Sequence, residues 1–241
     1  MKKLIVLLIL LMIISSSFGK SHHDLKGYHI KTGITGSEIS KDKKILHRDG
    51  NILDFDIADI DGNGIHEAAF IIKKISGKGG VIKIISLAEE PEVLYQGDLS
   101  EIEPFKIELG DFTGDGICEI ALGVVKKTPH HKIMAKRCFT YNLDFKEKRL
   151  VAKFRISKFS RPHEDFKLFD MDGDGIDEII TLEKNEDNSN RIAAYTWNGF
   201  GFNIKYKSDN YENLKSFQEE GQLKIDGRSV YLENDIIKVG E

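Results

Sequence analysis

The sequence has few of the residues that usually divide a chain into parts. Only four prolines occur among its 241 residues, and one short acidic-polar stretch, at 185–188, interrupts the pattern. Apolar residues make up 40% of the chain, which is enough to bury a sizeable core. We therefore expect a single domain over residues 20–241, without an interdomain linker.

A strong excess of charge and the common catalytic signatures are also missing. The formal net charge is −4, and a weakly acidic chain of this kind is not expected to bind nucleic acid. We find no nucleophile motif and no phosphate-binding glycine loop. The paired carboxylates that could serve a glycosidase belong to the acidic loops described below. The sequence names no catalytic residue and favours a non-enzymatic protein, with an enzyme as the alternative.

Long hydrophobic runs are confined to the N-terminus. Lys2 and Lys3 precede an apolar run over residues 4–14, and small residues follow up to Gly19. This order predicts a signal peptide over residues 1–19 and export to the periplasm or the extracellular space. The run is about half of the ~20 residues that span a bilayer, so an uncleaved anchor is the alternative. No cysteine lies near the cleavage site, so a lipoprotein is not expected, nor is stable membrane insertion after cleavage.

Cysteine is scarce, with one residue at 118 and one at 138. Export would permit a disulfide between them, and a hairpin turning near residues 128–130 would bring them towards each other. The alternative is two buried thiols. Pairing requires Cα atoms within roughly 7 Å, so the sequence leaves both possibilities open.

The chain does contain a threefold internal repeat. Residues 53–72, 105–124 and 164–182 align without gaps. Each copy begins with alternating apolar and polar residues, a pattern that predicts a half-buried strand. A tight glycine-rich loop follows, and then a short apolar run that predicts a strand buried on both faces. With the strand-like sequence that follows, each unit holds about four strands, as in a propeller blade.

We therefore predict an all-β, β-propeller-like fold of about three to four four-stranded blades. The repeats cover about 50–100, 102–158 and 162–208. Three blades alone would leave two open sheet edges. The strand-like segments at the two ends of the chain could join into a further blade and close the ring.

The loops carry oxygen-bearing side chains at matching positions, counted from the first aspartate of each. Positions 1, 3, 5 and 9 hold these side chains, position 6 is glycine and position 7 is isoleucine. Oxygens on alternate residues of a curled loop can converge on Ca²⁺, which takes six to eight oxygens at about 2.3–2.6 Å. The candidate ligands, with position 7 acting through its carbonyl, are Asp59, Asp61, Asn63, Ile65 and Glu67; Asp111, Thr113, Asp115, Ile117 and Glu119; and Asp170, Asp172, Asp174, Ile176 and Glu178.

This ligand pattern separates several alternatives. A plain polar β-turn would explain one copy, but not three with the same oxygens. An EF-hand needs a chelating position 12, which here is Phe70, Leu122 and Thr181. Zinc prefers His or Cys, and Mg²⁺ prefers a rigid octahedral shell. We predict up to three structural Ca²⁺ ions. The third loop, with its four acidic ligands, should bind tightest and the second loop weakest. The isoleucine side chains at position 7 are free to enter the core.

The motif Asp-x-Asp-Gly-Asp-Gly-x-x-Glu of the third loop, with its close copies, resembles the FG-GAP repeat. That repeat is the blade unit of integrin α-chain propellers and of many exported bacterial proteins. The resemblance covers roughly residues 50–210 and implies calcium ligation through positions 1, 3, 5, 7 and 9. Two features depart from the family: the Phe-Gly and Gly-Ala-Pro signatures are absent, and the chain has room for about four blades rather than seven.

The resemblance and the missing catalytic motifs together favour a non-enzymatic scaffold that binds a protein or glycan. Two alternatives stay open. One is a propeller-scaffold enzyme that acts on polysaccharide or lipid, with structural calcium. The other is a subunit that completes a larger propeller by assembly. Trp197 could offer a sugar-binding platform, although packing in the core is the expected role.

Overall fold

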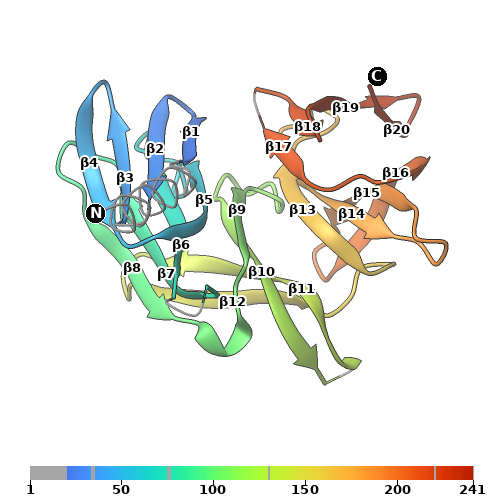
Figure 1. Cartoon of the computed structure of the whole chain (residues 1–241), viewed down its shortest axis with the longest axis horizontal. Helices are drawn as coiled ribbons and strands as arrows, with labels where there is room; N and C mark the ends of the chain where they lie inside the picture. The colour runs from blue at the N-terminus through green and yellow to red at the C-terminus, as the bar shows by residue number, and fades with distance from the viewer. Residues whose placement is uncertain (1–20, 34–35, 75–76, 130, 220, 241) are drawn as a thin grey trace, which may run out of the picture.

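The computed structural model describes residues 21–33, 36–74, 77–129, 131–219 and 221–240, and strands dominate it (Figure 1). The predicted signal peptide, residues 1–19, lies outside the described residues. Within these ranges, no helix has the length and apolar character that crossing a membrane requires.

The described strands form five antiparallel units of four strands, which we call sheets 1 to 5. Sheet 1 contains β1 (Ser21–Leu25), β2 (Tyr28–Gly33), β3 (Gly36–Lys41) and β4 (Lys44–Asp49). Sheet 2 contains β5 (Ile52–Ala58), β6 (Glu67–Lys73), β7 (Gly79–Ser86) and β8 (Val93–Asp98). Sheet 3 contains β9 (Lys106–Gly110), β10 (Glu119–Thr128), β11 (His131–Asp144) and β12 (Arg149–Ile156). Sheet 4 contains β13 (His163–Phe169), β14 (Glu178–Lys184), β15 (Asn190–Trp197) and β16 (Phe202–Tyr211). Sheet 5 contains β17 (Phe217–Glu219), β18 (Leu223–Ile225), β19 (Arg228–Glu233) and β20 (Ile236–Val239).

The predicted all-β, propeller-like fold of four-stranded units is confirmed. Sheets 2, 3 and 4 correspond to the three repeats, and Figure 1 shows the five sheets following one another in an arc. The structure differs from the sequence-based prediction in the number of units. The two ends of the chain do not join into one blade: the first strands form sheet 1 and the last strands form sheet 5.

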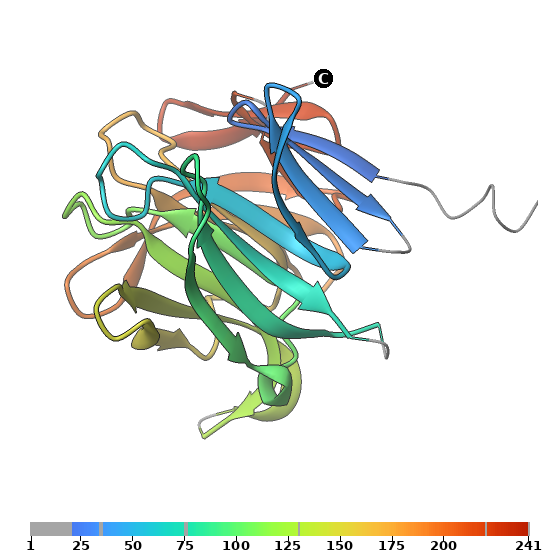
Figure 2. The same ribbon diagram turned by 90° about the vertical axis from the view of Figure 1, so that its left-hand side faces the viewer.

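Each pair of consecutive sheets shares a hydrophobic core. In β6, Ala68 and Phe70 pack towards sheet 1, whereas Ala69 and Ile71 pack towards sheet 3. The short apolar runs are therefore buried on both faces, as their composition predicted. Figure 2 shows sheet 1 beside sheet 2 in this arrangement. In the described part of the chain no buried cluster joins sheet 1 to sheet 5, so the core follows the arc and does not close it.

Sheets 4 and 5 are also joined through their backbones. Strand β20 pairs in parallel with β16, with Lys207 opposite Ile236 and Ser208 opposite Ile237. The last strand of the chain thus returns to the outer strand of the preceding sheet. The two units form one continuous sheet of eight strands.

The innermost strands carry charged residues that the alternating pattern suggested would face solvent. This expectation was wrong, because Asp56, Glu108, Asp165 and Lys167 are all buried. The carboxylates bond across to the next sheet: Asp56 Oδ2 accepts from the Leu109 N–H at 2.8 Å, and Asp165 Oδ2 from the Phe217 N–H at 2.8 Å. Buried polar groups need such partners, and here the partners lie on neighbouring sheets.

Lysines complete this inner network. Lys106 Nζ lies 2.7 Å from Asp165 and 3.3 Å from Glu108, and Lys167 Nζ lies 2.6 Å from Glu108 and 3.0 Å from Glu219. Strands β9, β13 and β17 are therefore connected by alternating charges as well as by apolar packing.

The two cysteines do not form a disulfide. Strands β10 and β11 form the expected hairpin, but Cys138 lies opposite Gly123, whereas Cys118 precedes the first residue of β10. The hairpin register therefore separates them, and of the two possibilities the structure shows free thiols.

Buried His163 predicts a measurable dependence of stability on pH. Burial lowers the pKa of His163 from 6.5 to about 4, and the nearby charge of Lys136 acts in the same direction. A histidine whose pKa is lowered by folding stabilises the protein above pH 6.5 and loses that contribution as the pH falls to 4. Urea unfolding measured from pH 6.5 down to pH 4 should show that the free energy of unfolding falls by about 3 kcal/mol more in the wild type than in His163→Phe.

The carboxylates that also titrate in this interval are common to both proteins, so the difference isolates His163. The substituted ring keeps aromatic neighbours, because Phe159 and Phe166 lie 5.0 and 6.2 Å away between ring centroids. His131→Phe, at the partly exposed start of β11, is the matched control for replacing a histidine with an aromatic ring. Equal slopes for the wild type and His163→Phe would contradict the assignment.

Candidate metal centre

The three acidic loops connect the first two strands of sheets 2, 3 and 4, and they share one backbone geometry. The carboxylate at position 1 accepts from the N–H at position 6 in each loop: Asp59 from Gly64 at 2.8 Å, Asp111 from Gly116 at 2.7 Å and Asp170 from Gly175 at 2.9 Å. The side-chain oxygen at position 5 accepts from the N–H at position 7, at 2.7, 3.0 and 2.9 Å. The repeated sequence therefore produces a repeated curled loop.

Two glycines make each curl possible. In the first loop Gly62 and Gly64 have φ values of 72° and 86°, and the glycines at the same positions of the other loops have matching values. These left-handed conformations strain residues that carry a Cβ. Among the glycines, the sequence pattern singled out only position 6. Position 4 is also glycine in all three copies, and that repetition was the signal for the second turn.

In the first loop, the ligand candidates gather around one point. Single carboxylate oxygens of Asp59, Asp61 and Glu67 lie within 4.8 Å of one another. Two oxygens bound to the same Ca²⁺ at about 2.3–2.6 Å can be up to ~5 Å apart, so these three fit one ion. Asn63 follows them along the curl, with its side-chain oxygen turned to the Ile65 N–H.

No lysine or arginine among the described residues pairs with these three carboxylates. Glu67 is buried, and its Oε2 accepts from the Ile60 N–H, at 2.8 Å. Burial raises the pKa of Glu67 to about 7, and Asp61 and Asp59 push it in the same direction. The first loop thus concentrates negative charge without an internal cation.

The third loop gathers carboxylates in the same way but already contains a cation from the protein. Asp170, Asp172 and Asp174 each place an oxygen within 4.8 Å of the others. Lys205 Nζ lies 2.6 Å from Asp172, 3.2 Å from Asp174 and 2.8 Å from Glu178. Its ammonium group therefore contacts three of the four acidic side chains predicted to bind metal.

The second loop follows the same plan, with three carboxylates as in the first loop and threonine at position 3. Lys153 forms an ion pair with buried Glu119, and Thr113 Oγ1 donates to Glu119 at 3.0 Å. Among the described residues, Asp111, Asp115 and Glu119 do not meet the spacing that the other two loops meet. The second loop is therefore the poorest fit to a divalent ion.

A β-bulge explains why two loops contain a lysine and one does not. In sheet 3, Thr140 pairs with Phe154 and Tyr141 with Ala152, which leaves Lys153 unpaired between them. Sheet 4 repeats this irregularity at Lys205. In sheet 2 the corresponding bulge residue, between the partners of Ile84 and Ile85, is Leu94. The bulge residue of the outer strand thus decides whether the loop receives an ammonium group, which the loop sequences alone could not indicate.

The loops also contact one another. The N–H at position 8 donates to the preceding loop, from Cys118 to the Ile60 carbonyl at 3.0 Å and from Asp177 to the Asp111 carbonyl at 2.9 Å. The loop sequences alone indicate no role for position 8, and only its place beside the neighbouring loop reveals one. The three loops therefore lie side by side at one end of the sheets.

The predicted burial of the position 7 isoleucines was wrong for two of the three. Ile65 and Ile117 are 42% and 43% exposed, because the loops project beyond the ends of the strands. Ile176 is partly buried, and its side chain lies against Gly114 of the second loop. Ile176 thus lies against a neighbouring loop, whereas Ile65 and Ile117 face solvent.

Comparisons with known proteins add little to this geometry. No protein-family model matches the chain, and no curated protein matches its sequence. Among solved structures, it is similar to the β-propeller domain of Nup133 from Vanderwaltozyma polyspora, with a TM-score of 0.49 and 11% sequence identity. That match covers 85% of this chain and 67% of the other. The description of this chain as a β-propeller therefore rests on its own sheet topology.

Proposed function

We propose that this chain is an exported, FG-GAP-like β-propeller module that binds structural Ca²⁺ and acts by binding a partner protein rather than by catalysis. The arrangement of carboxylates in the first loop is the observation that supports calcium binding. This loop brings three carboxylates from different residues to the spacing of one ion, and no described cation neutralises them.

Electrostatics favours an ion in this loop. A buried carboxylate without a partner is costly, and two further carboxylates nearby increase that cost through repulsion. A divalent cation removes both penalties, while Asn63 and the Ile65 carbonyl can add neutral oxygens. The ion would be structural, since it would hold the loop that joins β5 to β6 and lies against the second loop.

Lys153 and Lys205 change the order of calcium affinities that the number of acidic ligands in each loop predicts. That count places the third loop first, because it has four acidic ligands. We propose instead that the first loop binds Ca²⁺ tightest, because an ion entering the third loop must displace the ammonium group of Lys205. Lys153 and Lys205 thus act as built-in cations that hold their loops without metal.

Thermal unfolding of the purified protein in calcium and in chelator tests this assignment. Calcium should stabilise the wild type by about 2.7 kcal/mol when its concentration is a hundred times the Kd. Asp61→Asn or Glu67→Gln should remove most of that gain, because each takes a charge from the first loop. Native mass spectrometry should find the ion in the wild type and lose it in these variants.

Asp115→Asn is the matched control, since it places in the second loop the residue that the first loop already has at position 5. It should leave the response to calcium unchanged. The calcium assignment fails if the wild type melts identically in calcium and in chelator. It also fails if Asp61→Asn keeps the full response.

A further inference from the structure

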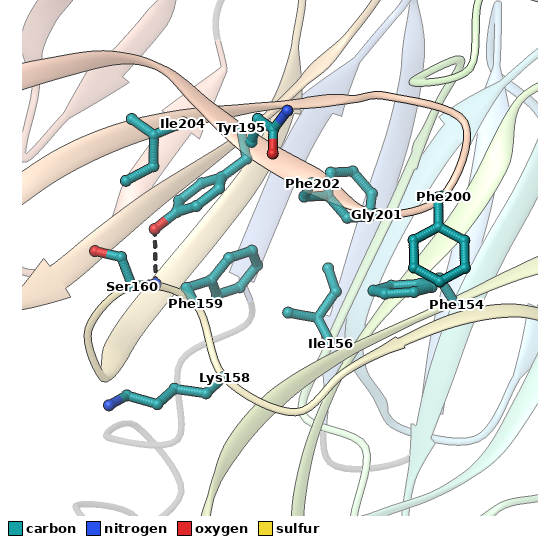
Figure 3. A pocket seen from close by; sticks show the side chains of 11 residues that line it. Phe154, Ile156, Lys158, Phe159, Ser160, Tyr195, Phe200, Gly201, Phe202 and Ile204 are labelled. Carbon is teal, nitrogen blue, oxygen red and sulfur yellow. Dashed lines mark hydrogen bonds between the residues drawn. The ribbon is translucent and has the colours of Figure 1, made fainter.

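Two exposed apolar side chains lie beside a hollow between sheets 3 and 4. A pocket of about 620 Å³ opens there, between β12, the 157–160 segment and the β15–β16 turn (Figure 3). At its rim, Phe200 is 89% exposed and Ile204 is 37% exposed. Isolated exposed apolar residues are normal, but two beside an apolar pocket mark a binding surface.

The wall behind the pocket is built of packed aromatic rings. Phe154, Phe202 and Trp197 pack together with ring centroids 5.1–5.9 Å apart, and Phe112 joins them from the second loop. This packing gives Trp197 the core role expected for it. Phe200 takes no part in these ring contacts. The Asn198 side chain holds its turn by accepting from the N–H groups of Phe200 and Gly201, at 3.0 and 2.8 Å.

The pocket continues into a second, polar hollow of about 410 Å³, and the two share Lys158 and Ser160. Lys184 and Arg161 also line this second hollow. Lys158 and Lys184 are exposed and form no ion pair with any described residue. We call the two hollows together the β12–β16 groove; Figure 3 shows its apolar end at Phe154 and Phe200, and Lys158 at the opposite end.

Acidic residues near the basic end do not cancel its charge. Glu186 and Asp187 line the polar hollow, but Asp187 Oδ1 accepts from the Ser189 N–H at 2.9 Å and from its hydroxyl at 2.6 Å. Three cations, Lys158, Lys184 and Arg161, line the hollow against these two carboxylates, so a net positive charge remains. The groove therefore offers apolar contact at one end and positive charge at the other.

From this geometry we infer that the β12–β16 groove binds an extended segment of a partner protein, in which a large apolar side chain lies a few residues from acidic ones. The apolar side chain fills the pocket beside Phe200, and the carboxylates meet Lys158 and Lys184. This inference rests on the proposed function as a protein-binding module and names its surface and its class of partner.

Hydrogen bonding favours a peptide over a sugar at the apolar end. A sugar ring needs several free polar groups, but the Tyr195 hydroxyl already donates to Glu183 at 2.5 Å and accepts from the Ser160 N–H at 2.9 Å. An apolar side chain needs none. Strand β12 is also the outermost strand of its sheet, so an extended peptide can bond to its backbone.

Selection of random short peptides displayed on phage, against the full protein, tests the inference whatever the sequence of the natural partner. The selected peptides should share one large apolar residue with Asp or Glu close by. Synthetic copies, measured by fluorescence anisotropy, should bind Phe200→Ser at least about tenfold more weakly. The double variant Lys158→Glu, Lys184→Glu should lose affinity by a similar factor, and its binding should no longer weaken as salt is added.

Ile133→Ser and Lys132→Glu are the matched controls, because both residues are exposed on β11 and neither lines the groove. They should leave affinity unchanged. The inference is overturned if the selected peptides share no apolar-acidic pattern, or if Phe200→Ser binds them as the wild type does. Oligosaccharides that bind at Phe200 in place of peptides would overturn it in favour of a glycan site.

Repeating the anisotropy measurement in calcium and in chelator separates this inference from the calcium proposal. If peptides bind while calcium has no effect on unfolding, the calcium proposal alone fails. If calcium stabilises the protein while selection yields no pattern, the groove inference alone fails.

Discussion

Replacing Asp165 with alanine should lower the free energy of unfolding by about 3–5 kcal/mol. Its carboxylate holds Lys106 at 2.7 Å and accepts from the Phe217 N–H at 2.8 Å, so it joins β13 to strands of both neighbouring sheets. The variant leaves a largely buried ammonium group without its nearest partner and a buried N–H without an acceptor. Thermal unfolding should show a melting temperature lower by roughly 6–20 °C.

Two other variants show whether burial causes the effect. Asp209→Ala removes a carboxylate that lies 3.0 Å from Lys238 but is mostly exposed, so it should cost much less stability than Asp165→Ala. Asp165→Asn keeps one acceptor oxygen and should fall between the two alanine variants. If Asp165→Ala and Asp209→Ala lose equal stability, the inner charge network does not hold the sheets together.

Replacing Lys205 with leucine should make the stability of the third loop depend on calcium. Leucine is the residue that sheet 2 has at the corresponding bulge, Leu94. Without the ammonium group, Asp172, Asp174 and buried Glu178 repel one another. Because Lys205 is itself one quarter exposed, we expect a loss of about 2–4 kcal/mol in chelator rather than the full cost of a buried pair.

Calcium should restore much of that loss, so the difference between unfolding in calcium and in chelator should be larger in Lys205→Leu than in the wild type. Isothermal titration calorimetry should detect an additional binding event. Lys207→Leu changes an exposed lysine of the same strand and should leave both measurements unchanged. If Lys205→Leu gains no response to calcium, the lysine does not stand in for an ion.

The parts of the fold that could be predicted from the sequence are those with local periodicity. Apolar runs such as Ala68–Ile72 were correctly predicted as strands buried on both faces. Alternate residues of such a strand point to opposite faces, and both faces pack into a core, so every residue is apolar. The glycine at position 6 correctly marked the sharp turn of each loop. In both cases the cause lies within a few residues of its effect.

The parts that could not be predicted depend on contacts between distant segments. Asp165 and Lys106 looked like solvent-facing residues of half-buried strands, since nothing nearby in the chain shows that they meet. Lys205 lies 27 residues beyond Glu178, and only the register of β15 and β16 brings it to the loop. The number of units was underestimated because sheets 1 and 5 carry no acidic loop to reveal them.

The parallel pairing of β20 with β16 makes the two ends of the arc unequal. Sheet 5 is attached to sheet 4 through a shared core and also through main-chain bonds to its final strand. Sheet 1 is attached to sheet 2 by side chains, such as Lys83 with Asp49 at 2.7 Å, and by their common core. Local unfolding should therefore begin at sheet 1. Sheet 5 can separate from sheet 4 only after the backbone bonds between β20 and β16 break.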